Sequence, residues 1–175
     1  MKDNIRNNMI KKIEEFRLPR YREIPDVGLY LDQVTKYIED YLTQIDDSTL
    51  SLTPSMISNY VKKKIIDNPI KKQYYREQIA YLIFVALAKS VMSLEDISLM
   101  IHLQKMSYTG ERAYNYFVEE LENVLKAVFR EETELKEIGV DKTLEKNMLR
   151  NAVIAISHKV YLDALFAQVR EAEQV

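Results

Sequence analysis

The chain of 175 residues has no cysteine, no tryptophan, three glycines and four prolines. Without cysteine it has no disulfide, no thiolate zinc site and no thiol nucleophile, which is typical of a reducing compartment. So few glycines and prolines leave few of the turns that an all-β fold needs. The longest apolar run, 79–88, is about half of the ~20 residues that span a bilayer, and the N-terminus is charged rather than signal-like. These absences predict a mainly α, soluble protein of the cytoplasm.

The residues that are present suit a globular core with an uneven charge. Hydrophobic residues make up 47% of the chain and charged residues 30%, enough for one domain or for two small ones that share a core. Residues 53–76 carry six basic residues and one acidic residue, whereas 111–145 carry ten acidic and five basic residues. The formal charge of −2 therefore conceals a basic segment and an acidic one.

Apolar residues at helical spacing predict most of the elements. Their spacing of 4, 3, 4 and 4 from Val27 onward predicts a helix over 27–43, capped by Asp26 and followed by a loop over 44–52. Thr53-Pro54 is a typical helix start, and that helix should run to Ile65. The remaining expectations are a short N-terminal helix over 9–16, a β-like hairpin over 70–75, a buried helix over 76–88 and a Ser93-capped helix over 94–105.

The last third of the chain predicts two long amphipathic helices. One apolar seam is formed by Ala113, Phe117, Leu121, Val124 and Val128. The other seam is formed by Leu149, Val153, Ile156, Val160, Ala164 and Ala167. With Gly139 as a stop and Asp141 as a start between them, an antiparallel helical hairpin is the simplest packing. The apolar faces of these two helices can pack only against each other and the buried centre of the protein. Alternatively, they can also pack against a second copy of the chain.

The helix predicted over 54–65 has two faces that suit a DNA groove. Its apolar back is formed by Met56, Ile57, Tyr60, Val61 and Ile65. On the other face, the short side chains of Ser55, Ser58 and Asn59 are expected to reach bases, and Asn59 can pair with an adenine edge. The expected phosphate contacts are Lys62, Lys63, Lys71, Lys72 and Arg76. The alternative is that these lysines only complement the helix dipole and solvate the surface.

This segment resembles a known DNA-binding family. The run 52–66, the element Tyr74-Tyr75-Arg76-Glu77 and the later Ser93-Leu94-Glu95-Asp96-Ile97 are similar to the DNA-binding domain of MerR-type regulators. In that family a recognition helix ends in a tyrosine and a Gly-Leu-type turn, a wing ends in an Arg-x-Tyr element, and a later helix opens with Ser-Leu-x-Glu-Ile. Lys64 stands at the position of the turn glycine. The resemblance implies that Tyr74 completes the DNA-binding set.

A second resemblance covers roughly residues 17–105. Through Leu18-Pro19-Arg20-Tyr21 and Leu29-Tyr30-Leu31-Asp32-Gln33-Val34, the chain looks like the bacterial family catalogued as domain of unknown function 1836. That family implies a bacterial source and a winged helix-turn-helix-like core, and it brings no established activity. Together the observations predict a basic N-terminal arm over 1–24, a MerR-like winged-helix DNA-binding domain over 25–105 and a C-terminal helical hairpin over 106–175 for dimerisation. The expected function is DNA binding in transcriptional regulation by a homodimer.

Other chemistry has little basis in the sequence. The two histidines, His102 and His158, lie on different predicted helices without a metal-ligand set at suitable spacing. The chain has no glycine-rich phosphate loop and no nucleophile elbow. We therefore expect no enzyme, no metal and no cofactor. The main rival to DNA binding is a helical adaptor whose basic patch docks an acidic protein.

Overall fold

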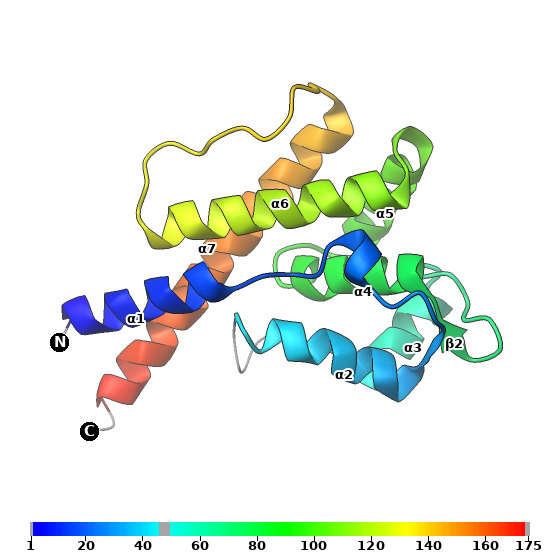
Figure 1. Ribbon diagram of the computed structural model, residues 1–175, viewed down its shortest axis with the longest axis horizontal. Coiled ribbons are helices and arrows are strands. Elements are labelled where there is room, and N and C mark those ends of the chain that lie inside the picture. The colour runs from blue at the N-terminus through cyan, green and yellow to red at the C-terminus, as the bar shows by residue number, and fades with distance from the viewer. Residues whose placement is uncertain (1, 46–49, 174–175) are drawn as a thin grey trace.

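The computed structural model describes residues 2–45 and 50–173, and within them the protein is mainly helical, as predicted. The elements follow in the order α1 (Lys2–Glu15), the 3-10 helix η1 (Tyr21–Glu23), β1 (Leu29–Tyr30), α2 (Leu31–Leu42), α3 (Pro54–Lys62), β2 (Gln73–Tyr74), α4 (Arg76–Ala88), α5 (Leu94–Ser107), α6 (Gly110–Phe129) and α7 (Leu144–Glu173). Figure 1 shows α4 at the centre, with α2 on one side and α6 on the other. Part of the predicted loop over 44–52 lies outside the described residues.

One hydrophobic core joins all three predicted parts of the chain. Helix α4 is buried nearly all round, as its uniformly apolar sequence predicted, and it packs against α2, α6 and α7. Buried side chains from the N-terminal segment, the middle and the C-terminal third belong to the same cluster. The three parts therefore do not have separate cores.

The N-terminal segment is a packed element rather than an arm. Its helix begins at Lys2, earlier than the predicted start at residue 9, and α1 packs against α6. Ile13 and Phe16 are buried there, because they lie on the side of the segment that faces the core. Arg20 donates two hydrogen bonds, of 2.9 and 2.8 Å, to the Glu122 carboxylate of α6. The positive charge of this segment is thus partly neutralised inside the fold.

The prediction of a helix from Val27 is wrong by one turn, because β-pairing takes the first residues. Leu29 pairs with Tyr74 in the antiparallel ladder of β1 and β2, and α2 begins only at Leu31. At Gly28 the strands approach so closely that an added Cβ would lie 2.8 Å from the Gln73 Cβ. Asp26 caps no helix and instead forms an ion pair with Arg76 at 3.5 Å.

The C-terminal helices run parallel, so the predicted antiparallel hairpin is wrong. Residues later in α6 contact residues later in α7. Arg112 pairs with Asp141 at 2.7 Å just before α7 begins, and Glu120 pairs with Arg150 further along both helices. Near the end of α6, the rings of Phe129 and Tyr161 lie 5.3 Å apart. Figure 1 shows both helices leading away from the α5 end, with the connection returning along α6. The helical periodicity of apolar residues identified the buried faces, but it contains no information on the relative direction of the two helices.

The connection between α6 and α7, residues 130–143, is an extended crossover. Helix α6 ends at Phe129 because Glu131 adopts a left-handed backbone, with φ of 57°, and the Glu132 N–H closes the turn on the Ala127 carbonyl at 2.9 Å. Gly139 and Asp141, predicted as helix stop and start, therefore lie inside this crossover. The Arg150 guanidinium donates to the carbonyls of residues 135 and 136, both at 3.2 Å, and so ties the crossover to α7.

Candidate nucleic-acid interface

Helix α3 has the two faces that the sequence predicted. Thr53 caps it by accepting a hydrogen bond from the Met56 N–H at 3.2 Å. Ile57 and Tyr60 are buried against the core and fix the helix on the domain. The opposite face is open to solvent and carries Ser55, Ser58, Asn59 and Lys62. The predicted base-reading residues are thus brought together on one exposed helical surface.

The segment after α3 turns back through a left-handed lysine. Lys64 has a φ of 58°. Its N–H bonds the Val61 carbonyl at 2.9 Å, and the Ile65 N–H bonds the Tyr60 carbonyl at 3.0 Å. This pair of bonds is a Schellman motif, in which the left-handed position usually holds glycine. The helix therefore stops at Lys62 instead of reaching Ile65 as predicted.

The predicted hairpin is a two-residue turn that carries two lysines at its tip. Ile70 and Gln73 exchange both backbone hydrogen bonds at 2.9 Å. Lys71 and Lys72 between them have φ of 48° and 65°. Two central residues at positive φ define a type I′ turn, whose usual residues are asparagine and glycine. Both lysine side chains are exposed.

Three of the four non-glycine residues with positive φ in the described part of the chain are lysines of this one region: Lys64, Lys71 and Lys72. A left-handed backbone costs an L-residue roughly 1–2 kcal/mol, and strain of this kind is concentrated at functional sites. We use the name lysine surface for the surface formed by Lys62, Lys63, Lys64, Lys71 and Lys72. Among the described residues, Lys63 is the only one of these five lysines that forms an ion pair, and its partner is Glu95 at 3.6 Å.

Two predicted DNA contacts do not reach this surface. Tyr74 is buried in the ladder with β1, so its side chain packs in the core. Arg76 points back into the fold, where its Nε donates to the Ile24 carbonyl at 2.9 Å and its guanidinium lies over the Tyr21 ring. Strand pairing holds Tyr74 inward, and contacts with the Ile24 carbonyl and the Tyr21 ring hold Arg76, so neither position supports the predicted DNA contact. Arg76 instead joins the segment before β1 to α4.

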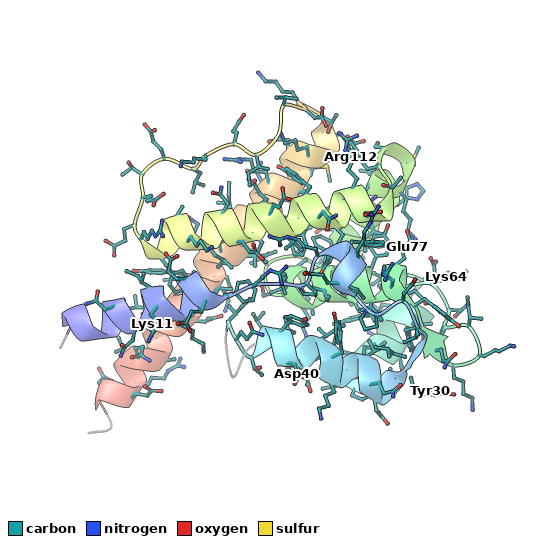
Figure 2. All side chains as sticks on the ribbon, viewed as in Figure 1. Lys11, Tyr30, Asp40, Lys64, Glu77 and Arg112 are labelled. Carbon is teal, nitrogen blue, oxygen red and sulfur yellow. The ribbon has the colours of Figure 1, made fainter. Side chains whose placement is uncertain are left out.

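The position of the lysine surface leaves it accessible. In Figure 1, β2 lies at the end of the molecule opposite to both chain termini. Figure 2 places Lys64 at this end and Lys11 of α1 at the other. Helices α6 and α7 do not cover α3. Of the three strained lysines, Lys64 alone had a signal in the sequence, because it stands where the MerR-type pattern has a turn glycine.

The histidines do not form a site. His102 is exposed on α5 and His158 is exposed on α7. Among the residues that the structure describes, no group of three or more histidine, aspartate or glutamate side chains is arranged to hold a metal ion. The feature that the sequence did not predict is a mostly apolar cavity between α4, α5, α6 and the crossover.

The protein is mainly helical, with a long C-terminal helix, α7, and with left-handed backbone positions in its lysine surface. Residues 19–117 match the model of the family described as Domain of unknown function (DUF1836). The match covers more than half of the 175 residues, and the chain belongs to this family. Membership predicted from the sequence is thereby confirmed. Neither the comparison with curated proteins nor the comparison with solved structures yields a match.

Proposed function

We propose that the protein binds double-stranded DNA in the cytoplasm of a bacterium and acts in transcriptional regulation, with α3 as the recognition helix and the 70–73 hairpin as a short wing. The observation that carries this proposal is the lysine surface, because three of its lysines occupy backbone positions that favour glycine or asparagine. Lysine at such positions destabilises the fold. A role for the positive charge explains why the residue is there.

The order of elements supports a winged helix-turn-helix, MerR-like arrangement. Strand β1 precedes the helix pair α2 and α3, and the hairpin that follows returns to pair β2 with β1. Helix α2 packs on α3 and on α4, which holds α3 from behind. In this arrangement α3 presents Ser55, Ser58 and Asn59 to the major groove, where Asn59 can read an adenine edge.

The lysines act on phosphates beside α3. Lys62, Lys64, Lys71 and Lys72 have no ion-pair partner within 4.0 Å among the described residues, so their ammonium groups are available. Each phosphate contact releases a counterion, and four such contacts give a slope of log affinity against log salt of about −4. Affinity should then fall about a hundredfold between 50 and 200 mM salt.

Fluorescence anisotropy on a labelled duplex of mixed sequence tests the proposal. The Lys71→Glu, Lys72→Glu double variant should bind at least about tenfold more weakly at low salt, with a slope smaller by about 2, because two phosphate contacts are lost. Glutamate is no better suited to positive φ than lysine, so the fold should be affected little. The matched control is Lys11→Glu, Lys142→Glu, which makes the same change in formal charge at exposed positions away from α3.

Two results would contradict DNA binding. One is the absence of an anisotropy change for the wild type at low salt, and the other is an equal loss in both double variants. Either result would favour the helical adaptor whose basic surface docks an acidic protein, which pull-down with polyglutamate would then detect.

We further propose that a second copy of the chain covers the C-terminal half of α7. Leu162, Phe166 and Val169 are exposed there at spacings of 4 and 3, which places them on one helical stripe. Such a stripe is self-complementary across a twofold axis, and a dimer would contact two DNA half-sites. By length and composition alone α7 could also cross a membrane, but Val153, Ile156 and Val160 near its middle are buried in the core.

Light scattering after size exclusion tests this assembly. The wild type should elute with twice the 20.6 kDa chain mass, and Leu162→Lys, Phe166→Lys should elute as a monomer. The control Leu99→Lys, Met106→Lys removes two exposed apolar side chains from α5 and should remain a dimer. A monomeric wild type would contradict the proposal, and binding of the wild type to lipid vesicles would assign the stripe to a membrane instead.

A further inference from the structure

A cavity of about 300 Å³ lies where α4, α5 and α6 meet the crossover and the beginning of α7. Its volume is at the lower end of small-molecule sites, and its lining is mostly apolar. It combines residues of the family-matched part, 19–117, with residues of the C-terminal part. A ligand held in this cavity would therefore contact both parts of the chain.

Aromatic rings dominate the lining of this cavity. They belong to Tyr81, Phe84, Tyr108, Tyr114, Tyr116 and Phe117. Positive groups of the protein already lie over three of the rings: Lys105 is 4.9 Å from the centroid of Tyr81, Arg112 is 5.1 Å from that of Tyr108, and Lys146 is 5.6 Å from that of Tyr116. These rings thus attract cations, and three of them already hold a positive group of the protein over one face.

Carboxylates exceed cations around the cavity. The acidic side chains are Glu77, Glu119, Asp141 and Glu145, and the basic ones are Arg112 and Lys146. Both basic groups are engaged, since Arg112 pairs with Asp141 at 2.7 Å and Lys146 donates to the Gly139 carbonyl at 2.9 Å. Figure 2 shows Glu77 and Arg112 near the beginning of α6. Glu77 and Glu119 have no ion-pair partner within 4.0 Å among the described residues, although the charge of Arg20 acts on Glu119 from a longer distance.

The α6 wall has two buried side-chain oxygens without hydrogen-bond partners among the described residues. The Tyr116 hydroxyl has no hydrogen-bond partner among the described residues, and burial raises the pKa of this group to about 12. One turn further along α6, Glu120 is fully buried; Arg150 pairs with its Oε1, while its Oε2 has no partner. The Tyr116 hydroxyl can therefore accept a hydrogen bond from a ligand, whereas the negative charge of Glu120 is offset by Arg150.

We infer that the cavity binds a small monovalent organic cation, an ammonium group on an apolar or aromatic body. The body would lie among the aromatic rings, and the charge would lie toward the rim that carries Glu77 and Glu119. An anionic ligand would meet the same excess of carboxylates and lose affinity. This inference does not depend on DNA binding, because the cavity and the lysine surface share no residue.

Isothermal titration calorimetry with three probes of similar shape tests the inference. Benzyltrimethylammonium should bind with 1:1 stoichiometry, and its neutral isostere neopentylbenzene and the anion 3-phenylpropanoate should bind at least tenfold more weakly. The Glu77→Gln, Glu119→Gln variant should bind the cation at least threefold more weakly, with unchanged affinity for the neutral isostere. The control Glu15→Gln, Glu134→Gln alters charge equally at exposed positions outside the lining and should leave cation affinity unchanged.

A second variant tests the location independently of charge. Ala113→Leu places a larger side chain on the cavity wall and should abolish binding of both cation and isostere, while circular dichroism verifies that the helical content is retained. Three results would overturn the inference: no saturable binding of the cation, equal affinity for cation and isostere, or unchanged binding by a folded Ala113→Leu variant.

Discussion

Replacing Arg150 by methionine should lower the free energy of unfolding by about 3–5 kcal/mol, the usual cost of leaving one charge of a buried pair without its partner. The Glu120 side chain is fully buried and Arg150 is its only ion-pair partner among the described residues. The same substitution removes the two bonds that tie the crossover carbonyls of residues 135 and 136 to α7. Urea denaturation followed by circular dichroism measures the loss.

A double variant separates the charge from the shape of this site. Glu120→Leu combined with Arg150→Met replaces both charges by apolar groups of similar size, and it should recover most of the stability lost by Arg150→Met alone. If the double variant is as unstable as Arg150→Met, the crossover bonds rather than the unpaired carboxylate account for the loss.

The pH dependence of the single variant has a definite sign. Burial is the main cause that raises the pKa of Glu120 above its ordinary value of 4.5. A carboxyl whose pKa is raised by folding binds a proton more tightly in the folded protein, so its protonation favours folding. The stability of Arg150→Met relative to wild type should thus be greatest below pH 4.5 and decline as the pH rises through the raised pKa. The variant that also contains Glu120→Leu should lack this decline.

Changing the hairpin tip to Lys71→Asn, Lys72→Gly should stabilise the fold and weaken DNA binding at the same time. Asparagine and glycine are the preferred residues of a type I′ turn, and removing two lysines from positive φ should raise the free energy of unfolding by about 1–2 kcal/mol. Two lost phosphate contacts should reduce the salt slope by about 2 and the affinity at low salt by at least about tenfold. Denaturation and anisotropy on the same samples measure both effects.

A gain in stability together with a loss of DNA affinity would show that the strained lysines are kept for binding and not for folding. Glu131→Gly is the control, because it relieves positive φ at the end of α6 without removing a lysine. It should stabilise the protein and leave DNA affinity unchanged. A hairpin variant that gains stability and binds DNA as the wild type does would contradict a functional role for the left-handed lysines.

The helices and their buried faces could be predicted because local chemistry determines them. Thr53 and Ser93 accept the cap hydrogen bonds that their side chains suggested, and the apolar residues of α3, α4, α6 and α7 form the core. The start of the helix predicted over 27–43 could not be placed correctly from its own residues, because its first turn is replaced by a strand whose partner, Gln73–Tyr74, lies far along the chain.

The candidate site was predictable only in part. Ser55, Ser58 and Asn59 are exposed because helical periodicity separates them from Ile57 and Tyr60. The same periodicity could not show that Tyr74 and Arg76 turn inward, since that depends on β1 and on the Ile24 carbonyl. The cavity was not visible at all, because residues of several separate segments line it.

The sequence by itself determined that this protein is mainly helical, that one surface is basic, and that it belongs to its family, because composition, caps and periodicity act over short distances along the chain. Only the tertiary structure decided that α6 and α7 run parallel, that lysines occupy the left-handed positions, and that Glu120 is buried beside Arg150. The parallel packing and the buried ion pair arise from contacts between residues distant in sequence, whereas the left-handed lysines belong to turns closed by hydrogen bonds within a few residues. Packing between distant segments depends on the whole chain, so patterns in a short stretch of sequence could not reveal it.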